Sequence, residues 1–306
     1  MPSPSDSQDS SLLPTLFNTL RPAFLLLTLV CVFLGAATVI ADGYTINPGI
    51  LLLVLLAALL AHISVNMLNE YSDFKTRLDY YTTRTPFNGG SGALLLNPEK
   101  ADAVLVAGII SLLLSCLIGL YFISQYGYAL IPLGLVGLLL VITYTPWLNR
   151  HPFLCLLAPG TGFGLVMVCG TQFVLQGQYS SLAWQAALLP FFLGNNLLLL
   201  NQYPDRQADQ KAGRYHFPIA YGITNSNRVY FLFIVLGMGS IVIPIMYGQF
   251  PLLSLIALIP APLAFYALYG GIKYREAIGS QLRFGAANVA VSLLAPLLLG
   301  LSFILA

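Results

Sequence analysis

Residues 66–79 read NMLNEYSDFKTRLD, a segment that ends one long apolar run and opens a polar loop. A second segment, residues 201–214, reads NQYPDRQADQKAGR and follows another apolar run much further along the chain. In both segments carboxylates come first and basic residues follow closely. We expect the two acid clusters to face each other in the folded protein.

The composition excludes a soluble globular protein. Of the 306 residues, 58% are hydrophobic and 8% are charged, and the mean hydropathy is +0.81. This leaves too little polar surface to coat a globule in water. A helix needs about 20 apolar residues to span a bilayer, and the runs of that kind cover residues 22–41, 49–69, 102–124, 127–147, 153–176, 182–203, 228–248, 250–272 and 284–305. The sequence therefore predicts an all-α polytopic membrane protein with nine transmembrane helices.

The basic residues give this protein an orientation, because Lys and Arg concentrate on the cytoplasmic side of a membrane protein. With nine helices, all 13 Lys and Arg residues fall on the face that the N-terminus shares. We therefore predict that the N-terminus is cytoplasmic, that both acid clusters form an active-site cap on that side, and that the C-terminus is outside.

The chain divides into a short tail and a membrane domain. Residues 1–20 are expected to form a polar tail that runs into an interfacial segment, and residues 21–306 the transmembrane domain. The compact chain, in which we recognise no cleavable signal or transit peptide, favours a bacterial inner membrane.

The acid clusters have the residue types and the spacing of a magnesium site. Asn69 and Asp73 are four residues apart, as are Asp205 and Asp209, so each pair projects from one face of a helix. Oxygen ligands of this kind suit Mg²⁺, which commonly binds through one or two carboxylates together with phosphate and water. Two like-charged clusters repel each other unless cations intervene. A diphosphate held between them by two Mg²⁺ ions would join the two sides.

Basic residues and a glycine-rich loop accompany the acids. The basic residues that can neutralise the remaining diphosphate oxygens are Lys75, Arg84, Lys211 and Arg214. The glycines in residues 88–92 permit tight turns that aim N–H groups at an anion. The alternative is that the acids are exposed loop residues balancing their basic neighbours. Two matched clusters together with the glycine loop argue against that alternative.

Residues 69–73, Asn-Glu-x-x-Asp, followed by Asp79, resemble the first Asp-rich motif of the UbiA superfamily of intramembrane prenyltransferases. Residues 205–209, Asp-x-x-x-Asp, are similar to the second motif. The resemblance covers nearly the whole chain, because the family has nine transmembrane helices with these motifs after the second and the sixth. Within the superfamily, residues 66–79 look most like the branch that prenylates 1,4-dihydroxy-2-naphthoate in menaquinone biosynthesis.

Two departures from that branch concern the motifs themselves. Glu70 stands where the family usually has Asp, which keeps the charge and moves it outward by one methylene. The second motif reads NQYPD at residues 201–205, where the branch more usually has NNxRD. The second departure leaves the identity of the acceptor open.

The resemblance implies an enzyme that transfers a polyprenyl group from an isoprenyl diphosphate to an aromatic acceptor and releases diphosphate. Metal ions and basic groups would stabilise the departing diphosphate, and a nucleophilic carbon of the acceptor would attack the allylic cation. The implied metal ligands are Asn69, Asp73, Asp79, Asp205 and Asp209, and all of these except Asp79 are also implied to be catalytic. The implied diphosphate ligands are Lys75, Arg84, Lys211 and Arg214. The implied acceptor or cation region comprises Asn66, Tyr144 and Tyr203. Tyr203 could instead be an aromatic anchor at the membrane interface.

Other functions stay open at this point. A cation-coupled transporter could use the acids as ion sites, although transporter sites lie near the middle of the bilayer rather than at one end. A family member without activity could serve as a scaffold. A prenyltransferase could also act on 4-hydroxybenzoate or homogentisate. The expected partners are the diphosphate substrate, the aromatic acceptor and membrane lipid, without nucleic acid.

Overall fold

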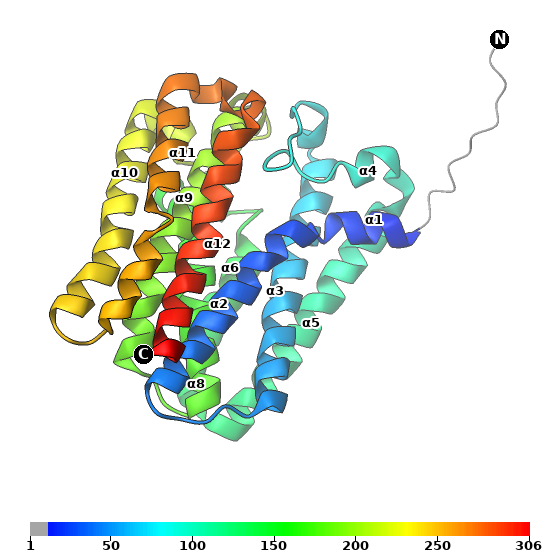
Figure 1. The fold of residues 1–306 in the computed structure, drawn as a ribbon. Helices are drawn as coiled ribbons and strands as arrows, with labels where there is room; N and C mark the ends of the chain where they lie inside the picture. The colour runs from blue at the N-terminus through cyan, green and yellow to red at the C-terminus, as the bar shows by residue number, and fades with distance from the viewer. Residues whose placement is uncertain (1–11) are drawn as a thin grey trace, which may run out of the picture.

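The computed structural model describes residues 12–306, which form helices, turns and loops with no β-strand among them. The prediction of an all-α protein is confirmed for these residues. Residues 1–11 of the predicted tail lie outside them. The first described element, α1 (Leu12–Thr19), runs across the ends of the neighbouring long helices rather than along them (Figure 1).

Eight helical stretches of the described chain are long and apolar enough to cross a membrane. They are α2 (Pro22–Ala41), α3 (Pro48–Lys75), η2 with α5 (Pro98–Lys100 and Ala101–Tyr126), α7 with η5 and α8 (Pro152–Gly160, Thr161–Cys169 and Gly170–Gln176), α9 (Ser181–Lys211), α10 (Phe217–Met246), η6 with α11 and η7 (Leu252–Leu258, Ala261–Tyr274 and Arg275–Ser280) and α12 (Leu282–Leu305).

The remaining predicted span is shorter than these eight. It consists of η3 (Tyr128–Leu130) and α6 (Ile131–Thr143), which are apolar but below the length of the others. The count of nine membrane-spanning helices therefore stays a prediction. The other short helices lie in connections and are η1 (Leu78–Tyr80), α4 (Ala93–Leu96) and η4 (Leu148–Arg150).

Helices α3 and α9 are longer than a bilayer requires. Their predicted spans end at residues 69 and 203, whereas α3 continues to Lys75 and α9 to Lys211. At 1.5 Å per residue the 31 residues of α9 cover about 46 Å, against about 30 Å of hydrocarbon. Both acid clusters therefore lie on the last turns of helices rather than in loops, because the helical hydrogen bonds continue past the end of each apolar run.

The connection between α9 and α10 is also shorter than the sequence suggests. Helix α10 begins at Phe217, ahead of the predicted residue 228, and a break at Gly222 separates its first turn from the rest. The φ of 75° at Gly222 is a conformation that glycine adopts readily. Residues 212–216 alone form the connection, so the residues after the second acid cluster turn straight back over the end of the bundle.

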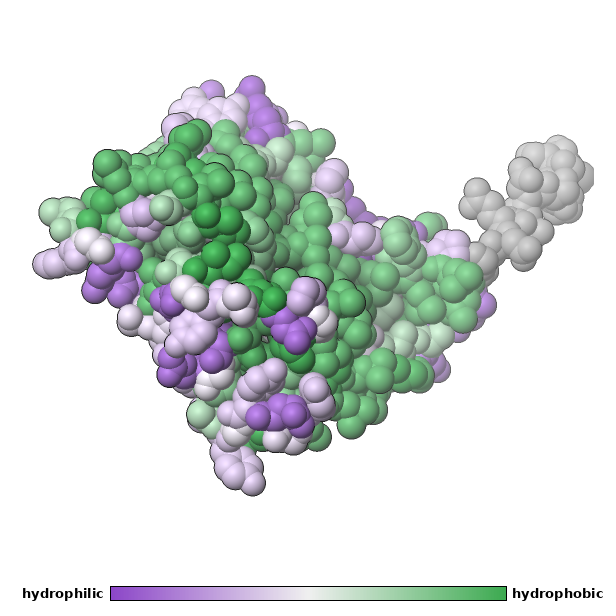
Figure 2. All heavy atoms as spheres, turned by 60° about the horizontal axis from the view of Figure 1, so that its bottom comes forward, coloured by the Kyte–Doolittle hydropathy of each residue, from purple (hydrophilic) through white to green (hydrophobic). Residues whose placement is uncertain are grey.

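The polar connections gather at one end of the bundle, which we call the polar end and define as residues 76–100, 212–216 and 275–281. This end is uppermost in Figure 1, and the C-terminus lies at the opposite, far end. Figure 2 looks partly onto the far end, where hydrophilic side chains gather, while hydrophobic side chains cover the flank of the bundle. A flank of this kind suits contact with lipid.

Helix α9 packs closely against the span formed by α7, η5 and α8. A Cβ added at Gly164 would lie 2.6 Å from the backbone N of Phe191 and 2.7 Å from the carbonyl O of Ala187. Directly after Pro159, the N–H of Gly160 donates to Asn195 Oδ1 at 2.6 Å. The glycines of this span thus let its backbone approach that of α9, as small residues commonly do between membrane helices.

Gly164→Ala should destabilise the protein, because the added methyl group would meet the α9 backbone, which cannot move aside as a side chain can. We expect a loss of about 1–3 kcal/mol, the usual cost of overpacking, measured as a lower midpoint of thermal unfolding in detergent. Gly239→Ala in α10 is the control. Its Cβ would be 3.9 Å from Ile243 Cδ1, so it should be neutral or stabilising. Equal midpoints for the two variants would contradict the proposed packing role.

Candidate active site

A cavity of about 800 Å³ opens at the polar end and continues into the bundle between α3, α5, α6, η5 and α9. Most of the residues singled out in the sequence lie along its wall. Those that line it are Asn66, Asn69, Asp73, Asp79, Tyr144, Asp205, Asp209 and Arg214. The two acid clusters are thus brought to one cavity from helices that are far apart in the sequence.

Arg214 joins the two clusters directly. Its guanidinium donates through Nη2 to Asp73 Oδ1 and through Nη1 to Asp209 Oδ1, the latter at 2.9 Å. The expectation that the clusters face each other is therefore confirmed. Burial disfavours a charged guanidinium, but the facing carboxylates of Asp73 and Asp209 outweigh it and raise the pKa of Arg214. Arg214 therefore stays charged.

His216 adds a second contact to Asp209 that the sequence did not reveal. Its Nε2 lies 2.9 Å from Asp209 Oδ2, and the side chain is buried against the cavity. Both carboxylate oxygens of Asp209 are therefore occupied, one by Arg214 and one by His216. The only hint in the sequence was the position of His216 just after the second acid cluster, because no spacing rule pairs residues seven apart across a turn.

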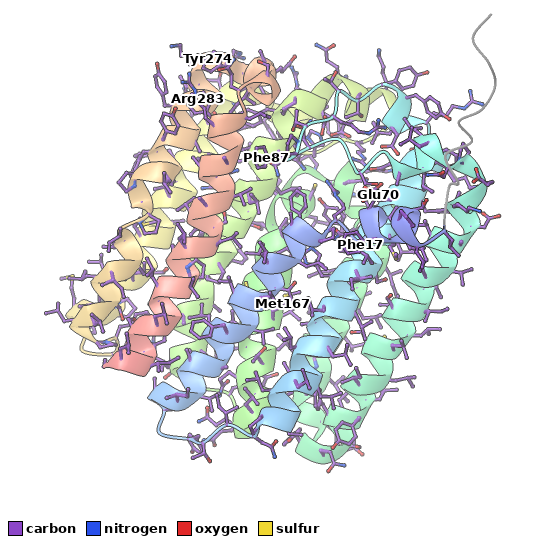
Figure 3. All side chains as sticks on the ribbon, turned by 45° about the vertical axis from the view of Figure 1, so that its right-hand side comes forward. Phe17, Glu70, Phe87, Met167, Tyr274 and Arg283 are labelled. Atoms are coloured by element: carbon purple, nitrogen blue, oxygen red, sulfur yellow. The ribbon has the colours of Figure 1, made fainter. Side chains whose placement is uncertain are left out.

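The glycine loop reaches the second cluster through Asn88. The side-chain Nδ2 of Asn88 donates to Asp205 Oδ1 at 2.8 Å, and Thr85 bonds to the Asn88 side chain within the loop. Phe87 of the same loop packs where Gly285 of α12 leaves room for its ring, and Figure 3 shows it beside the end of that helix. The loop between α3 and α4 therefore crosses the mouth of the cavity from the first cluster to the second.

Glu70, the departure from the usual Asp, holds the other end of this loop. Its Oε1 accepts the backbone N–H of Ser91 at 2.7 Å and its Oε2 accepts the Ser91 hydroxyl at 2.6 Å. Arg21 Nε is 3.8 Å from Oε1. The carboxylate is buried and both its oxygens are used, on the side of α3 that faces the loop (Figure 3). The longer side chain of Glu thus anchors the loop rather than facing the open cavity.

Asp79 lies beneath the same loop, and one of its carboxylate oxygens has no hydrogen-bond partner. The side chain is buried, and its Oδ2 has no hydrogen-bond partner. Burial, together with the nearby carboxylates of Asp73 and Glu70, raises the pKa of Asp79 to about 7, against the opposing effect of Arg84 and Arg214. An acid so placed favours either a proton or a cation on that oxygen.

Asn66, Asn69 and Tyr144 line the cavity near the first cluster. Asn66 donates from Nδ2 to the carbonyl O of Leu20 at 2.8 Å and so ties α3 to the start of α2. Asn69 Nδ2 is 3.4 Å from Thr145 Oγ1, which leaves its carbonyl oxygen free for another partner. Tyr144 follows α6 and sits against Cys155. These three side chains border the region between the acids and the apolar part of the cavity.

Four predicted site residues do not reach the cavity wall. Lys75 lies over the ring of Tyr71 and 3.8 Å from exposed Asp102, and Lys211 lies over the ring of Tyr81. The other two are Arg84, which bonds within the loop to the carbonyl O of Asp79, and Tyr203, which is buried with its hydroxyl bonded to Asn227 Oδ1 at 2.9 Å.

Helix geometry explains these positions. Lys75 and Lys211 are the last residues of their helices and point away from the face that carries the acids. Tyr203 is fully buried, so it is not an interfacial anchor. In the described chain the Lys and Arg residues that line the cavity are Arg21 and Arg214. Arg21 went unnoticed in the sequence because it looked like an ordinary topology signal before α2.

The donor set fits Mg²⁺, with the substrate as a necessary further ligand. The described residues contain no preformed cluster of three or more His, Cys, Asp or Glu ligands. Mg²⁺ does not require one, since it usually binds through one or two carboxylates, water and phosphate. Among the lining residues, Asp73, Asp79, Asp205 and Asp209 offer carboxylate oxygens and Asn69 offers an amide oxygen. The Oδ2 of Asp79 is a buried oxygen without a hydrogen-bond partner.

Comparison with known proteins is consistent with this site. Residues 28–290 match the UbiA prenyltransferase family. The chain is 27% identical over 223 residues to the 1,4-dihydroxy-2-naphthoate octaprenyltransferase of Haemophilus influenzae. The aligned region covers 70% of this chain and 71% of that protein. It is 28% identical over 228 residues to the enzyme of the same name from Bacillus subtilis, and this alignment covers 70% of this chain and 68% of that enzyme.

Solved structures share the fold. A digeranylgeranylglyceryl phosphate synthase is similar with a TM-score of 0.64 at 16% identity, covering 96% of this chain and 99% of that one. A UbiA homologue from Archaeoglobus fulgidus bound to DMAPP and Mg²⁺ is similar with a TM-score of 0.60 at 15% identity, covering 95% and 99%. At these identities the likeness establishes the fold.

Arg214→Gln should destabilise the metal-free protein, because it leaves the buried carboxylates of Asp73 and Asp209 facing each other without a counter-ion. Breaking a buried ion pair typically costs about 3–5 kcal/mol, so we expect a clearly lower midpoint of thermal unfolding in EDTA. Arg228→Gln is the control, since Arg228 is exposed and bonds to nearby Asn225 in α10. If both variants melt like the parent protein, Arg214 is not the counter-ion of the two clusters.

Proposed function

The chain belongs to the UbiA prenyltransferase family, and we propose that it transfers a polyprenyl group from an isoprenyl diphosphate to 1,4-dihydroxy-2-naphthoate and releases diphosphate. Family membership makes the chain a membrane-embedded prenyltransferase, so the transporter alternative is not retained. The choice of acceptor rests on relatives that carry this activity in their names. The choice of donor rests on homologues bound to DMAPP and GPP.

The observation that carries the proposal is the contrast between the two parts of the cavity. Carboxylates from α3 and α9 and two arginines border its mouth, whereas apolar side chains line the part within the bundle. A substrate that matches this contrast has a highly charged head and a long apolar tail. An isoprenyl diphosphate has both, because its diphosphate carries several negative charges and its prenyl chain carries none.

Asn69, Asp73, Asp79, Asp205 and Asp209 would hold Mg²⁺ together with the diphosphate. Bound Mg²⁺ would neutralise the negative charge that develops on the diphosphate as it leaves. Homologues bound to DMAPP or GPP with Mg²⁺ support the use of this ion with a diphosphate substrate. We expect two ions, one for each acid cluster.

The residues of the chain itself supply positioning and charge. Arg214 and Arg21 lie at the cavity mouth and can donate to diphosphate oxygens as the C–O bond to the prenyl group breaks and its electron pair leaves with the diphosphate. Asn66 and Tyr144 border the place where the allylic cation forms. A ring carbon of the acceptor then forms the new C–C bond, and the ring recovers its electron pair by losing from that carbon either a proton or the carboxylate as CO2.

Glu70 acts on the site through the loop rather than through the substrate. Its two hydrogen bonds to Ser91 fix one end of the loop, and the bond from Asn88 to Asp205 fixes the other. The loop therefore lies across the mouth, where it would limit the entry of water that could quench the cation. Lys75, Arg84 and Lys211 are not retained as diphosphate ligands, because they lie off the cavity wall.

The direct test offers acceptors separately to detergent-purified protein with geranylgeranyl diphosphate and Mg²⁺. We expect prenylated product, followed by mass spectrometry, from 1,4-dihydroxy-2-naphthoate and not from 4-hydroxybenzoate or homogentisate. If only 4-hydroxybenzoate or only homogentisate gave product, the proposed prenyl transfer would stand and the proposed acceptor would be wrong. No product from any acceptor, by a protein that remains folded, would refute the proposed function.

Variants in the same assay test the two clusters. Asp73→Asn and Asp205→Asn should each lower kcat/KM by about a hundredfold or more, the usual cost of removing a group that stabilises charge in the transition state. EDTA should abolish turnover. Asp102→Asn is the control, because Asp102 has an exposed side chain outside the cavity, and it should behave like the parent. Full activity of either site variant would remove that carboxylate from the metal-binding set.

We also propose that the polar end faces the cytoplasm of a bacterial inner membrane. Its support is the position of the 13 basic residues, all of which fall on that side of the membrane if the chain crosses it nine times. Tyr81→Cys at the polar end and Tyr247→Cys at the far end place reporters at exposed positions. In intact cells a membrane-impermeant maleimide should label only the second. If only Tyr81→Cys were labelled, the polar end would face the outside and the proposed orientation would be wrong.

A further inference from the structure

His62 is a buried polar side chain in the apolar part of the cavity, away from both acid clusters. On α3 it shares one helical face with Asn66, Asn69 and Asp73, and all four side chains line the cavity. It lies about 16 Å along the helix from Asp73. An ionisable side chain at such a depth in a membrane protein usually has a functional role.

The contacts of His62 determine which ring nitrogen carries the proton. Its Nδ1 lies 2.8 Å from Oγ1 of Thr28, a fully buried side chain on α2. The Thr28 hydroxyl has one proton to donate, and within residues 12–306 it bonds to this nitrogen alone. In the opposite arrangement Nδ1–H would donate to Thr28, and the hydroxyl proton would be left unpaired in an apolar interior, which costs free energy. We therefore assign Nδ1 as the acceptor and Nε2–H as a donor.

The second nitrogen of His62 faces the cavity. Nε2 has no hydrogen-bond partner among the described residues, and it is not one of the polar atoms that the protein encloses without a partner. The ring packs edge-to-face against Phe163 with 4.9 Å between the centroids, and Phe163 also lines the cavity. The neighbouring lining residues of α3 are apolar, namely Ala58, Ala61 and Val65. This part of the cavity thus offers one hydrogen-bond donor beside an aromatic ring.

The reactants differ in what they can offer to this donor. A prenyl chain is a hydrocarbon and has no oxygen, and the diphosphate belongs with the acid clusters at the mouth. The aromatic acceptor has ring oxygens and a flat face that suits Phe163. Its carboxylate is attracted to Arg21 and Arg214, which line the mouth. The side of the ring opposite the carboxylate therefore points toward His62.

We propose that His62 binds the aromatic acceptor by donating from Nε2 to the ring hydroxyl farthest from the acceptor's carboxylate, and that Thr28 sets the tautomer that makes this bond possible. In 1,4-dihydroxy-2-naphthoate that group is the hydroxyl at position 4. The inference rests on the proposed prenyl transfer and adds a residue that orients the acceptor. The bond would fix the ring so that its reacting carbon faces the prenyl group.

His62→Phe removes the donor and keeps an aromatic ring against Phe163. We expect the KM for 1,4-dihydroxy-2-naphthoate to rise about three- to tenfold, the usual effect of losing one hydrogen bond, while the KM for geranylgeranyl diphosphate stays within about twofold of the parent. His151→Phe is the control, because His151 is outside the cavity and bonds to the carbonyl O of Trp147. It should leave both KM values unchanged. Unchanged KM values in His62→Phe, or an equal rise in both, would overturn the proposal.

An acceptor analogue identifies the oxygen that His62 binds. The compound 1-hydroxy-2-naphthoate lacks only the hydroxyl at position 4, and its inhibition constant is measured in competition with the acceptor. The parent and His62→Phe should give the same inhibition constant, because neither can form the bond with this compound. A rise as large as that of the acceptor KM would show that His62 does not bind this hydroxyl, and the proposal would be wrong.

Thr28→Val separates this role from a structural one, in which the bond between Thr28 and His62 only ties α2 to α3. Without the Thr28 donor the proton can occupy either ring nitrogen, so the acceptor KM should rise by less than in His62→Phe, with the donor KM unchanged. A purely structural bond predicts a lower midpoint of thermal unfolding in both variants with no change in the ratio of the two KM values. That result would overturn the proposal.

A binding measurement covers the case in which the parent shows no turnover, which would count against the proposed function. Equilibrium dialysis of 1,4-dihydroxy-2-naphthoate is then carried out on the parent and on His62→Phe, with Mg²⁺ and the unreactive analogue geranyl thiodiphosphate present. Binding that is weaker in the variant by about threefold or more supports the role of His62. Equal affinity overturns it.

Discussion

Two like-charged carboxylates from distant helices are buried beside one another, and the rest of the active-site end follows from that constraint. Asp73 and Asp209 each lose most of their hydration, and in a medium of low polarity their repulsion would push α3 and α9 apart. Arg214 lies between them and donates to both. The short turn after α9 brings Arg214 back over the end of the bundle. The length of this connection therefore determines whether Arg214 can lie between the two carboxylates.

The same constraint explains why the loop between α3 and α4 is ordered. Glu70 is buried and Asp205 is partly buried. Both would be costly to desolvate without partners, and both receive them from this loop, through Ser91 and Asn88. Each bond to a carboxylate is a charge-assisted bond of the stronger kind. The loop is thus fastened at both sides of the cavity mouth by the acids that it covers, and the extra methylene of Glu70 gives the reach that one of these bonds requires.

Tight and loose packing are divided between the two sides of the bundle. On one side the glycines of η5 bring it into backbone contact with α9, which fixes the second acid cluster relative to the core. On the other side α6 is short and buries little of its surface, so an apolar cavity persists beside it. In water such a cavity would tend to collapse, because closing it removes apolar surface from the solvent. In a bilayer lipid is as apolar as the helices, and that driving force is absent.

The sequence by itself determined the class of the fold, the positions of most spans and the identity of the acid clusters. Hydrophobic runs of bilayer length and the one-sided distribution of Lys and Arg depend on local composition, and pairs four residues apart on a helix share a face whatever the rest of the chain does. These properties explain why Asn69, Asp73, Asp205 and Asp209 were identified correctly as neighbours of one cavity.

Only the tertiary structure decided which basic groups serve that cavity. Lys75, Lys211 and Arg84 are close to the acids in sequence, yet each points elsewhere, whereas Arg21 and His216 reach the site from other segments. Tyr203 likewise turns into the core toward Asn227. Long side chains at helix ends and in loops have many directions open to them. Their direction is set by which distant charges the packing of the helices brings within reach, and that information is not local to any stretch of the chain.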